Sequence, residues 1–251
     1  PEDLNIIKNG PSERRRFIDM ELSQLDKIYL SCLVNYNKVV NQRNKLLKDF
    51  ALSGRQDILQ SLDVWDIQLV RYGTEVIKGR IEFINHINRL VEKIHNKLSG
   101  SKEKLEIIYE PCVDIKNFTY ETARVRDRDI KLKCTNIGPH KDDMIFMING
   151  KDVRKFGSQG QQRTAALSLK LAEIELVKQI IHDTPVLLLD DVLSELDSSR
   201  QNFLLDSIGD IQTIVTCTGL DEFINSRFSI NKIFKVVEGK IETEDSVQNH
   251  N

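Results

Sequence analysis

Two long stretches of helical hydrophobic periodicity dominate the first hundred residues of the chain. In the first stretch, the apolar residues that fall on one face of a helix are Leu25, Ile28, Cys32, Tyr36, Val39, Leu46 and Phe50. Polar Arg43 interrupts this stripe. The second stripe alternates spacings of three and four residues in its first half, as a coiled-coil seam does, and consists of Leu62, Trp65, Leu69, Tyr72, Val76, Gly79, Phe83, Ile87, Leu90, Ile94 and Leu98.

A short polar segment, ALSGRQD at residues 51–57, separates the two stripes. Two helices of about 35 to 40 residues joined by so short a turn predict an antiparallel hairpin roughly 50 Å long. Two ordinary core helices of a bundle would produce a similar pattern. The length of the stripes favours an arm that projects from the rest of the protein.

The composition is that of a globular protein and narrows the possible partners. The chain has 251 residues, of which 40% are hydrophobic and 29% charged, and its net charge is −2. A nucleic-acid surface would therefore be a local patch and not a property of the whole molecule. The four cysteines form no C-x-x-C pair, which indicates neither a zinc site nor a disulfide framework and fits a reducing cytoplasm. No apolar stretch approaches the roughly 18 residues of a membrane span.

Short strand and helix patterns alternate after Leu105. LEIIYE predicts a strand at 105–110, residues 120–133 predict a charged helix, and Asn149-Gly150 predicts the turn of a hairpin. A helix is expected over 161–181, an apolar strand at PVLLLDD (185–191), a helix at 198–208, a strand at 211–218 and a hairpin over 230–242. This alternation indicates an α/β domain with a mostly parallel sheet.

The strand PVLLLDD ends in two adjacent carboxylates, Asp190 and Asp191. Ligands bind at the carboxyl ends of the strands in open α/β sheets. A buried pair of carboxylates is costly unless a cation offsets the charge, and Mg²⁺ prefers carboxylate oxygens together with phosphates and water. The segment therefore predicts a magnesium site, although an acidic surface turn after a strand would leave the same pattern.

A glycine-punctuated polar turn, FGSQGQQRTAALSL at 156–169, precedes the helix expected over 161–181. Ser158 is suited to cap that helix, and free N–H groups would then point outward at the positive end of the helix dipole. Gly160 would let a bulky anion approach the backbone, and Gln161, Gln162 and Arg163 add donors and charge. The turn could hold a phosphate without a P-loop lysine, or it could simply be a capped helix after a loop.

Taken together, these motifs resemble those of ABC-type ATPases. SQGQQR, then LLLDD, then SELD follow the order of the signature motif, the Walker B strand and the D-loop. Gly157 replaces the leading leucine of the family signature, Gln159 replaces a glycine, and Asp191 stands where the catalytic glutamate usually lies. The segments PEDLNIIKNGPSERRRFIDMEL, YNKVVNQRNKLLK, IGPHKDD, FGSQGQQRT and LLLDDVLSELD also resemble those of the RecF family of bacterial recombination mediators, in the same order.

The resemblance implies roles for individual residues at a nucleotide held between two subunits. Asp190 would help to hold Mg²⁺, and Asp191 would act as the general base, with less reach than a glutamate. The γ-phosphate of ATP on the other subunit would be contacted by Ser158, Gln159, Gly160 and Gln161. Ser194 and Asp197 would line the dimer seam as the D-loop, although S-x-x-D is also good helix-capping chemistry.

The fold class implied is α/β, an ABC-type ATPase head with an α-helical, coiled-coil-like arm. Residues 1–10 would end a head segment or form a linker, 11–104 would form the arm, and 105–251 the C-terminal part of the head. The family's activity would be ATP-driven dimerisation on gapped or single-/double-strand junction DNA. Slow, weak, DNA-dependent ATP hydrolysis would serve as a switch.

The implied partners are RecO and RecR, with RecA loading as the outcome, in the cytoplasm. One rival is an SMC- or Rad50-type chromosome-maintenance head, which would carry far longer coiled coils. Another is a helical interaction module without nucleotide function, against which the pair of carboxylates argues.

The P-loop that this chemistry needs is not in the chain. No G-x-x-x-x-G-K-[ST] occurs, and NGKD at 149–152 lacks the first glycine and the hydroxyl residue. In the RecF family this loop lies in an N-terminal segment that also supplies strands to the sheet of VLLLD. We therefore expect such a segment to complete the sheet, and we expect 1–251 without it neither to bind ATP in cis nor to fold stably.

Two arginine clusters are candidates for DNA contacts. The first, Arg14, Arg15 and Arg16, lies at a helix start, and basic clusters of this kind neutralise phosphates. The second is Arg124, Arg126 and Arg128, for which a solvated face paired with Asp127 and Asp129 is an equally good interpretation.

Two further positions bear on the nucleotide site. His140 lacks partners at metal-ligand spacing and is interpreted as structural or nucleotide-proximal. ABC proteins carry a switch histidine where this chain has Cys217, so Thr216 or Thr218 would be the sensor there.

Overall fold

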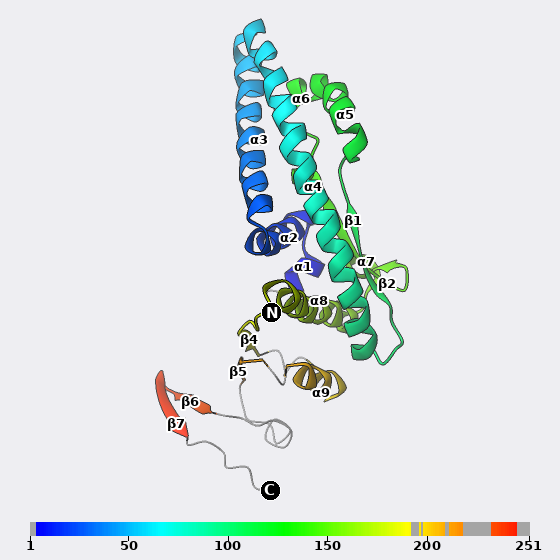
Figure 1. The fold of residues 1–251 in the computed structure, drawn as a ribbon, viewed down its shortest axis with the longest axis vertical. Coiled ribbons are helices and arrows are strands. Elements are labelled where there is room, and N and C mark those ends of the chain that lie inside the picture. The colour runs from blue at the N-terminus through cyan, green and yellow to red at the C-terminus, as the bar shows by residue number, and fades with distance from the viewer. Residues whose placement is uncertain (1–3, 192–195, 197, 209–210, 218–231, 245–251) are drawn as a thin grey trace. The chain divides into compact units, whose positions relative to one another are not determined.

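The computed structural model describes residues 4–191, 196, 198–208, 211–217 and 232–244. They fall into two compact units, residues 1–185 and 186–251, each of which is described by itself. The first unit is drawn from blue to yellow-green in Figure 1. Within the described residues, no helix is long and apolar enough to cross a membrane.

Two long antiparallel helices, α3 (Lys27–Ser53) and α4 (Gln56–Leu98), form the predicted hairpin (Figure 1). Gly54 ends α3 in the left-handed conformation, with φ +66°, so the turn lies within the polar segment 51–57. The helices differ in length, with 27 and 43 residues, because Asp26 starts α3 by accepting hydrogen bonds from the amides of Ile28 and Tyr29. The preceding residues form the separate helix α2 (Pro11–Leu25).

The hydrophobic pattern of the sequence predicts the buried face of α4 correctly, but it predicts that of α3 less accurately. Leu62, Leu69 and Val76 of α4 are fully buried, as the stripe predicts. At the start of α3, Ile28 is 76% exposed and Tyr29 is 3% exposed, so the buried face lies one residue away from the predicted one. The two helices approach closely at Gly79, where an added Cβ would lie 2.6 Å from the Tyr29 ring.

Two buried arginines of the hairpin link it to other elements. Arg43, which interrupts the apolar stripe of α3, is 0% exposed, and its guanidinium lies 2.7 Å from Asp66 and 2.6 Å from Asp129. Arg80 of α4 is 2% exposed and lies 2.8 Å from Asp19 and 2.9 Å from Asp142. Arg43 is thus a buried ionic centre that joins α3, α4 and the helix that carries Asp129.

The predicted single helix over 120–133 is wrong. A 3₁₀ turn, η1 (Ile115–Asn117), leads into two short helices, α5 (Phe118–Arg124) and α6 (Arg126–Leu132), which are separated at Val125. They pack along α4 and α3, respectively, on the hairpin itself (Figure 1). A segment that the sequence assigns to the head therefore lies on the arm, while the domain bounds themselves stay a prediction.

A three-stranded antiparallel sheet lies at the base of the hairpin. Its strands are β1 (Leu105–Glu110), β2 (Asp143–Ile148) and β3 (Lys151–Asp152), in that order. The predicted turn at Asn149-Gly150 is confirmed, with φ values of +49° and +76°, as a type I′ hairpin turn requires. A second 3₁₀ turn, η2 (Pro139–Lys141), precedes β2.

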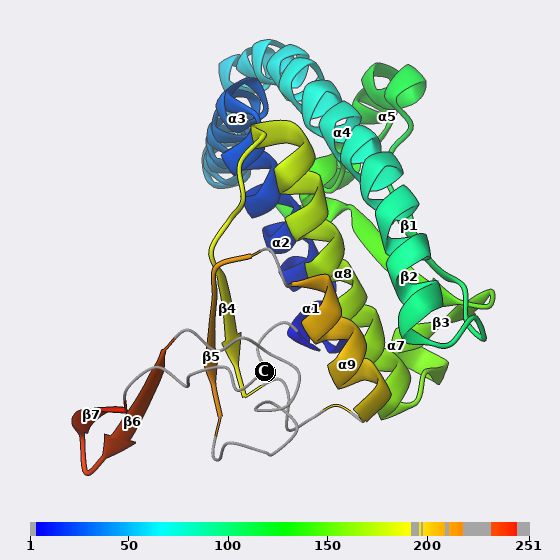
Figure 2. The same ribbon diagram turned by 60° about the horizontal axis from the view of Figure 1, so that its bottom comes forward.

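Three more helices complete the first unit. They are α1 (Leu4–Lys8), α7 (Val153–Phe156) and α8 (Gln159–Ile181). The long helix α8 packs against both α1 and α4 (Figure 2), and its Ala165, Leu169 and Ala172 are fully buried in the core. This packing fixes the N-terminus of α8, where the polar turn at 156–160 lies.

The second unit contains the strands β4 (Leu187–Asp190), β5 (Thr213–Thr216), β6 (Ile233–Val237) and β7 (Lys240–Glu244), with helix α9 (Ser198–Ser207). Strands β4 and β5 pair in parallel, and β6 and β7 form the predicted hairpin. The mostly parallel sheet is not found among the described residues, because β4–β5 is their one parallel pair. Nor is β4 fully buried: Leu189 is 6% exposed but Leu188 is 69% exposed.

Candidate functional site

The polar turn before α8 is a capping box. The Ser158 hydroxyl accepts a hydrogen bond from the Gln161 amide at 3.2 Å, and the Gln161 side-chain oxygen accepts one from the Ser158 amide at 2.9 Å. Ser158 therefore caps the helix as predicted. The amides of Gln159 and Gly160 lie in the first turn, where no helical acceptor exists, so they are suited to bind an anion.

The two glycines of the turn serve different purposes. A Cβ at Gly157 would lie 2.4 Å from the Val153 carbonyl oxygen, so only glycine fits this close approach between α7 and the turn. A Cβ at Gly160 would meet only the Ser158 hydroxyl, at 3.9 Å. Ser158, Gln159 and Gly160 are all exposed. The surface beside Gly160 is open, which fits its predicted approach to a bulky anion.

Gln161 uses its backbone amide and one side-chain donor within the fold. Its backbone amide is bound to Ser158, and its side-chain Nε2 donates to Glu103 Oε1 at 2.9 Å. The predicted phosphate contact of Gln161 stays a prediction, and only the second hydrogen of Nε2 could make that contact, whereas Ser158, Gln159 and Gly160 remain candidates. The sequence analysis missed Glu103, which lies 58 residues away and carries no motif.

The second unit places the pair of carboxylates at the end of β4. Asp190 is exposed and accepts a hydrogen bond from the Thr216 hydroxyl at 2.5 Å. Asp191 has a φ of +52°, and its amide donates to the Thr216 carbonyl at 3.1 Å. Thr216, the alternative sensor residue, is thus next to Asp190 at the same end of the parallel pair.

Asp190 and Asp191 have the ligand chemistry of a Mg²⁺ site, since they place two exposed carboxylates at adjacent positions at the end of β4. Among the described residues, no group of three or more histidine, cysteine, aspartate or glutamate side chains could hold a metal by itself. Phosphate oxygens and water would have to supply the other ligands. The proposed D-loop residues Ser194 and Asp197, and also Thr218, lie outside the described residues.

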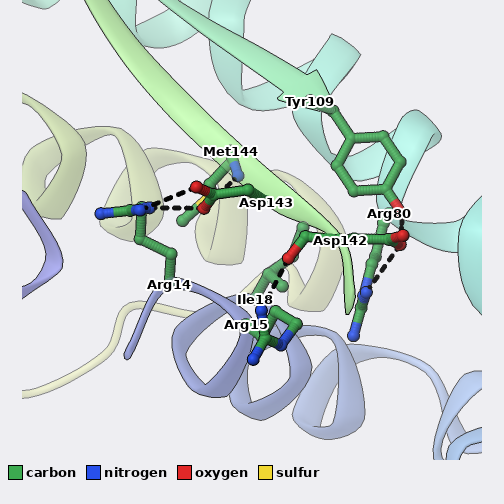
Figure 3. Close-up of a pocket in the computed structure, with 8 residues that line it drawn as sticks. All are labelled: Arg14, Arg15, Ile18, Arg80, Tyr109, Asp142, Asp143 and Met144. Atoms are coloured by element: carbon green, nitrogen blue, oxygen red, sulfur yellow. Dashed lines mark hydrogen bonds and ion pairs between the residues drawn. The ribbon is translucent and has the colours of Figure 1, made fainter. Parts of the chain in front are cut away.

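The first arginine cluster divides into structural and exposed members (Figure 3). Arg14 is 3% exposed and pairs with both carboxylate oxygens of Asp143, at 2.7 and 2.9 Å. The predicted DNA contact of Arg14 therefore does not fit, because its charge is used within the fold. Arg15 is partly buried and donates to the Asp142 carbonyl at 2.8 Å, whereas Arg16 is exposed.

Asp142 is the centre of the small pocket beside this cluster (Figure 3). Its carboxylate is 0% exposed and binds Arg80, the Tyr109 hydroxyl and the Cys112 amide. Burial raises the pKa of Tyr109, so that its hydroxyl stays protonated and donates to Asp142. The network joins α2, α4 and both long strands of the first sheet, and it is structural.

The second arginine cluster pairs with other carboxylates than predicted. Arg126 lies 2.6 Å from Asp63 of α4, and Arg124 lies 2.6 Å from Glu121. Asp129, the predicted partner, is bound instead to Arg43. The Arg126–Asp63 pair holds α6 on the hairpin, the Arg124–Glu121 pair lies within α5, and both favour the structural interpretation of the cluster.

His140 also has a structural role. Its Nδ1 lies 2.6 Å from the Tyr36 hydroxyl and its Nε2 lies 3.0 Å from the Thr135 carbonyl oxygen. A carbonyl can only accept, so Nε2 carries the proton and Nδ1 accepts from Tyr36. Burial lowers the pKa of His140, in agreement with this neutral form.

No protein-family model matches the chain. Among curated proteins, the chain is 69% identical over 245 residues to the DNA replication and repair protein RecF of Lachnospira eligens, covering 98% of the chain and 68% of the relative. It is 62% identical over 242 residues to the RecF protein of Lachnoclostridium phytofermentans, covering 96% and 67%. The chain thus spans about two thirds of the length of these relatives.

Solved structures give the same result. A structure of the recombination mediator RecF with ATP, from the RecFOR pathway, has a TM-score of 0.86 and 36% identity over 97% of this chain and 66% of that one. The Smc head domain of Pyrococcus furiosus has a TM-score of 0.52 at 16% identity, covering 97% and 60%, which shows a shared fold alone. The α/β head with a helical arm is therefore confirmed as the fold class, and the chain belongs to the RecF family of DNA replication and repair proteins.

Proposed function

We propose that this chain supplies the dimerising and hydrolytic part of an ATP-gated DNA-binding protein of recombinational repair. ATP would close a homodimer on gapped or junction DNA, and slow hydrolysis would open it again. The observation that carries this proposal is the exposed N-terminus of α8, where Ser158 and the amides of Gln159 and Gly160 face outward. The related RecF structure that contains ATP supports the choice of nucleotide.

In this mechanism the turn at 156–160 acts in trans. The Ser158 hydroxyl keeps its proton available, because it accepts from the Gln161 amide and can donate to a phosphate oxygen. Gly160 leaves room for the γ-phosphate bound by the partner subunit. Dimerisation then depends on ATP, since the phosphate completes a contact that neither subunit makes alone.

The end of β4 would act in cis. Asp190 would hold Mg²⁺, which neutralises phosphate charge when bound, and Asp191 would accept a proton from the attacking water. Thr216 orients the Asp190 carboxylate through its hydrogen bond. The shorter reach of aspartate compared with glutamate agrees with a weak ATPase that works as a switch.

We further propose that a segment with a P-loop adds strands to the β4–β5 pair. The pair exposes apolar side chains, with Val186 at 54%, Leu188 at 69% and Ile214 at 55%. An apolar parallel pair of this kind is normally covered on both faces. Leu188→Asp would then lower the unfolding midpoint of the full-length protein, and an unchanged midpoint would contradict the expected cover over this face of the pair.

The DNA surface would include Arg16, the exposed member of the first arginine cluster. We propose RecO and RecR as partners and RecA loading as the outcome. The RecFOR pathway named for the solved relative supports this assignment. An SMC-type function finds less support, because the hairpin helices have only 27 and 43 residues.

The test is the yield of crosslinked dimer with and without ATP, measured in the full-length protein. We expect ATP to raise the yield strongly, and Ser158→Arg to abolish that increase by placing a long side chain where the phosphate must approach. Ser31→Arg changes an exposed serine on α3 and serves as the matched control. Equal yields with and without ATP would refute the proposed mechanism.

A further inference from the structure

Glu103 joins the turn at 156–160 to the long arm helix. It lies between the end of α4 and the start of β1, and its side chain is 20% exposed. Oε1 accepts a hydrogen bond from Gln161 Nε2 at 2.9 Å, and Oε2 lies 3.3 Å from Nε2 of His95 in the last turn of α4. One carboxylate thus contacts both elements.

The charge of Glu103 sets the orientation of the Gln161 amide. A carboxylate only accepts hydrogen bonds, so the Gln161 nitrogen must face Glu103 and its oxygen must face the Ser158 amide. With the amide reversed, a donor would face the Ser158 N–H and the capping box would be lost. Glu103 therefore selects the one side-chain orientation that closes the turn.

The loop that carries Glu103 is itself held in place. The Ser99 hydroxyl accepts from the Glu103 amide at 3.3 Å. The side-chain oxygen of Asn149, at the tip of the β2–β3 hairpin, accepts a hydrogen bond from the Lys104 amide at 2.9 Å. The carboxylate consequently approaches Gln161 from a fixed backbone.

His95 fixes the other side of the carboxylate. Its ring is 0% exposed, and Nδ1 lies 2.9 Å from the hydroxyl of Ser168, which is also 0% exposed. Ser168 donates in turn to the Thr164 carbonyl of α8 at 2.7 Å. The last turn of α4 and the first turns of α8 are therefore linked through the contact between His95 and Ser168.

We propose that Glu103 is a positioning residue of the ATP-dependent dimer contact: it holds the turn at 156–160 in its anion-accepting form and ties that form to α4. This inference rests on the proposed function, because the turn must meet the nucleotide of the partner subunit. Glu103 touches no substrate itself. It acts through Gln161, and the phosphate is met by Ser158, Gln159 and Gly160.

The experiment measures the ATP-dependent dimer association constant of the full-length protein for Glu103→Ala, Glu103→Gln and Gln161→Ala. Since a hydrogen bond to a charged acceptor contributes a factor of about ten or more, we expect Glu103→Ala to lower the constant about tenfold. Glu103→Gln keeps an acceptor without the charge and should recover about half of this loss on a logarithmic scale. ATP binding to the monomer should stay unchanged, because the turn acts on the other subunit.

A double substitution separates positioning from general damage. If Glu103 acts only through Gln161, the dimer association constant of the Glu103→Ala/Gln161→Ala protein should fall about tenfold, as in each single variant, and not about a hundredfold. The control is Glu92→Gln, which removes an exposed carboxylate from the same end of α4, where Glu92 lies 3.2 Å from Lys104. The control should dimerise like the wild type.

The possible results distinguish the two proposals. If the wild type dimerises with ATP but the Glu103 variants match it, the positioning role is wrong and the proposed function stands. Additive losses in the double variant would also overturn the positioning role. If the wild type shows no ATP-dependent dimer, the proposed function itself fails. Should Glu103→Ala not fold, as judged by its helical circular dichroism, the comparison of Glu103→Gln with Glu92→Gln decides.

Discussion

Glu173 of α8 offers a sharp test of how burial controls ionisation in this protein. Its side chain is nearly buried, with 7% of the residue exposed, and Lys170 Nζ lies 3.0 Å from its Oε2. Its Oε1 has no hydrogen-bond partner among the described residues. Burial raises the pKa of Glu173 to about 8, with Lys170 opposing the rise and the Glu21 carboxylate adding to it.

The sign of the pH dependence follows from this raised pKa. In the unfolded chain a glutamate has a pKa of about 4.3, so between that value and about 8 the folded protein keeps a proton that the unfolded chain releases. Stability therefore falls as the pH rises through this window, by about 1.4 kcal/mol per pH unit. The total is about 3 to 4 kcal/mol at pH 7, and below pH 4 the effect is absent.

Glu173→Gln should remove this dependence, because glutamine resembles the protonated acid at every pH. We expect α8 to be about 3 kcal/mol more stable in the variant than in the wild type at pH 7, and within about 1 kcal/mol of it at pH 5. Hydrogen exchange of the α8 amides measures this, since comparing the two proteins at one pH cancels the intrinsic exchange rates. Glu175→Gln, at an exposed position of the same helix, is the control. An equal gain at both pH values would refute the reasoning.

Three further predictions concern the hairpin and the arginine cluster. Arg43→Met should lower the free energy of unfolding by about 3 to 5 kcal/mol in urea titrations, because it leaves buried carboxylates without their partner. Gly79→Ala should cost about 1 to 3 kcal/mol, since the new Cβ would lie 2.6 Å from an aromatic ring of α3, whereas Gly10→Ala meets nothing within 4 Å and should cost a few tenths. Arg16→Ala should weaken DNA binding and reduce its salt dependence without changing the unfolding midpoint, and Arg14→Ala should lower the midpoint. Unchanged midpoints for Arg43→Met and Gly79→Ala, or unchanged DNA affinity for Arg16→Ala, would contradict these assignments.

The features that the sequence predicts correctly depend on residues close together in the chain. The apolar stripe of α4, the cap at Ser158 and the turn at Asn149-Gly150 each follow from spacing or backbone preference within a few residues. The break at Asp26 was also open to local reasoning, because aspartate is a strong helix cap. The apolar stripe continues across Asp26, and hydrophobic periodicity alone does not indicate where a helix starts.

The features that could not be predicted depend on partners far apart in the chain. Arg43 meets Asp129 across 86 residues, and Arg14 meets Asp143 across 129. A single sequence shows three adjacent arginines and cannot show that one of them is buried against β2 while another is exposed. For the same reason Glu103 carries no local signal, although it orients the side chain that closes the turn before α8.

Helix α4 is held to its surroundings at three levels, and their spacing bears on how the dimer contact could reach the arm. Asp66 binds Arg43, Arg80 binds Asp19, and His95 contacts Glu103. At 1.5 Å per residue, successive levels are about 21 Å apart. A helix held at one point can pivot about it, whereas a helix held by polar side-chain contacts at three levels resists bending and rotation between them. Suppose that a displacement of the turn at 156–160 moves Glu103. The contacts at the end of α4 must then either resist this displacement or pass it on to the helix, which would move as one body.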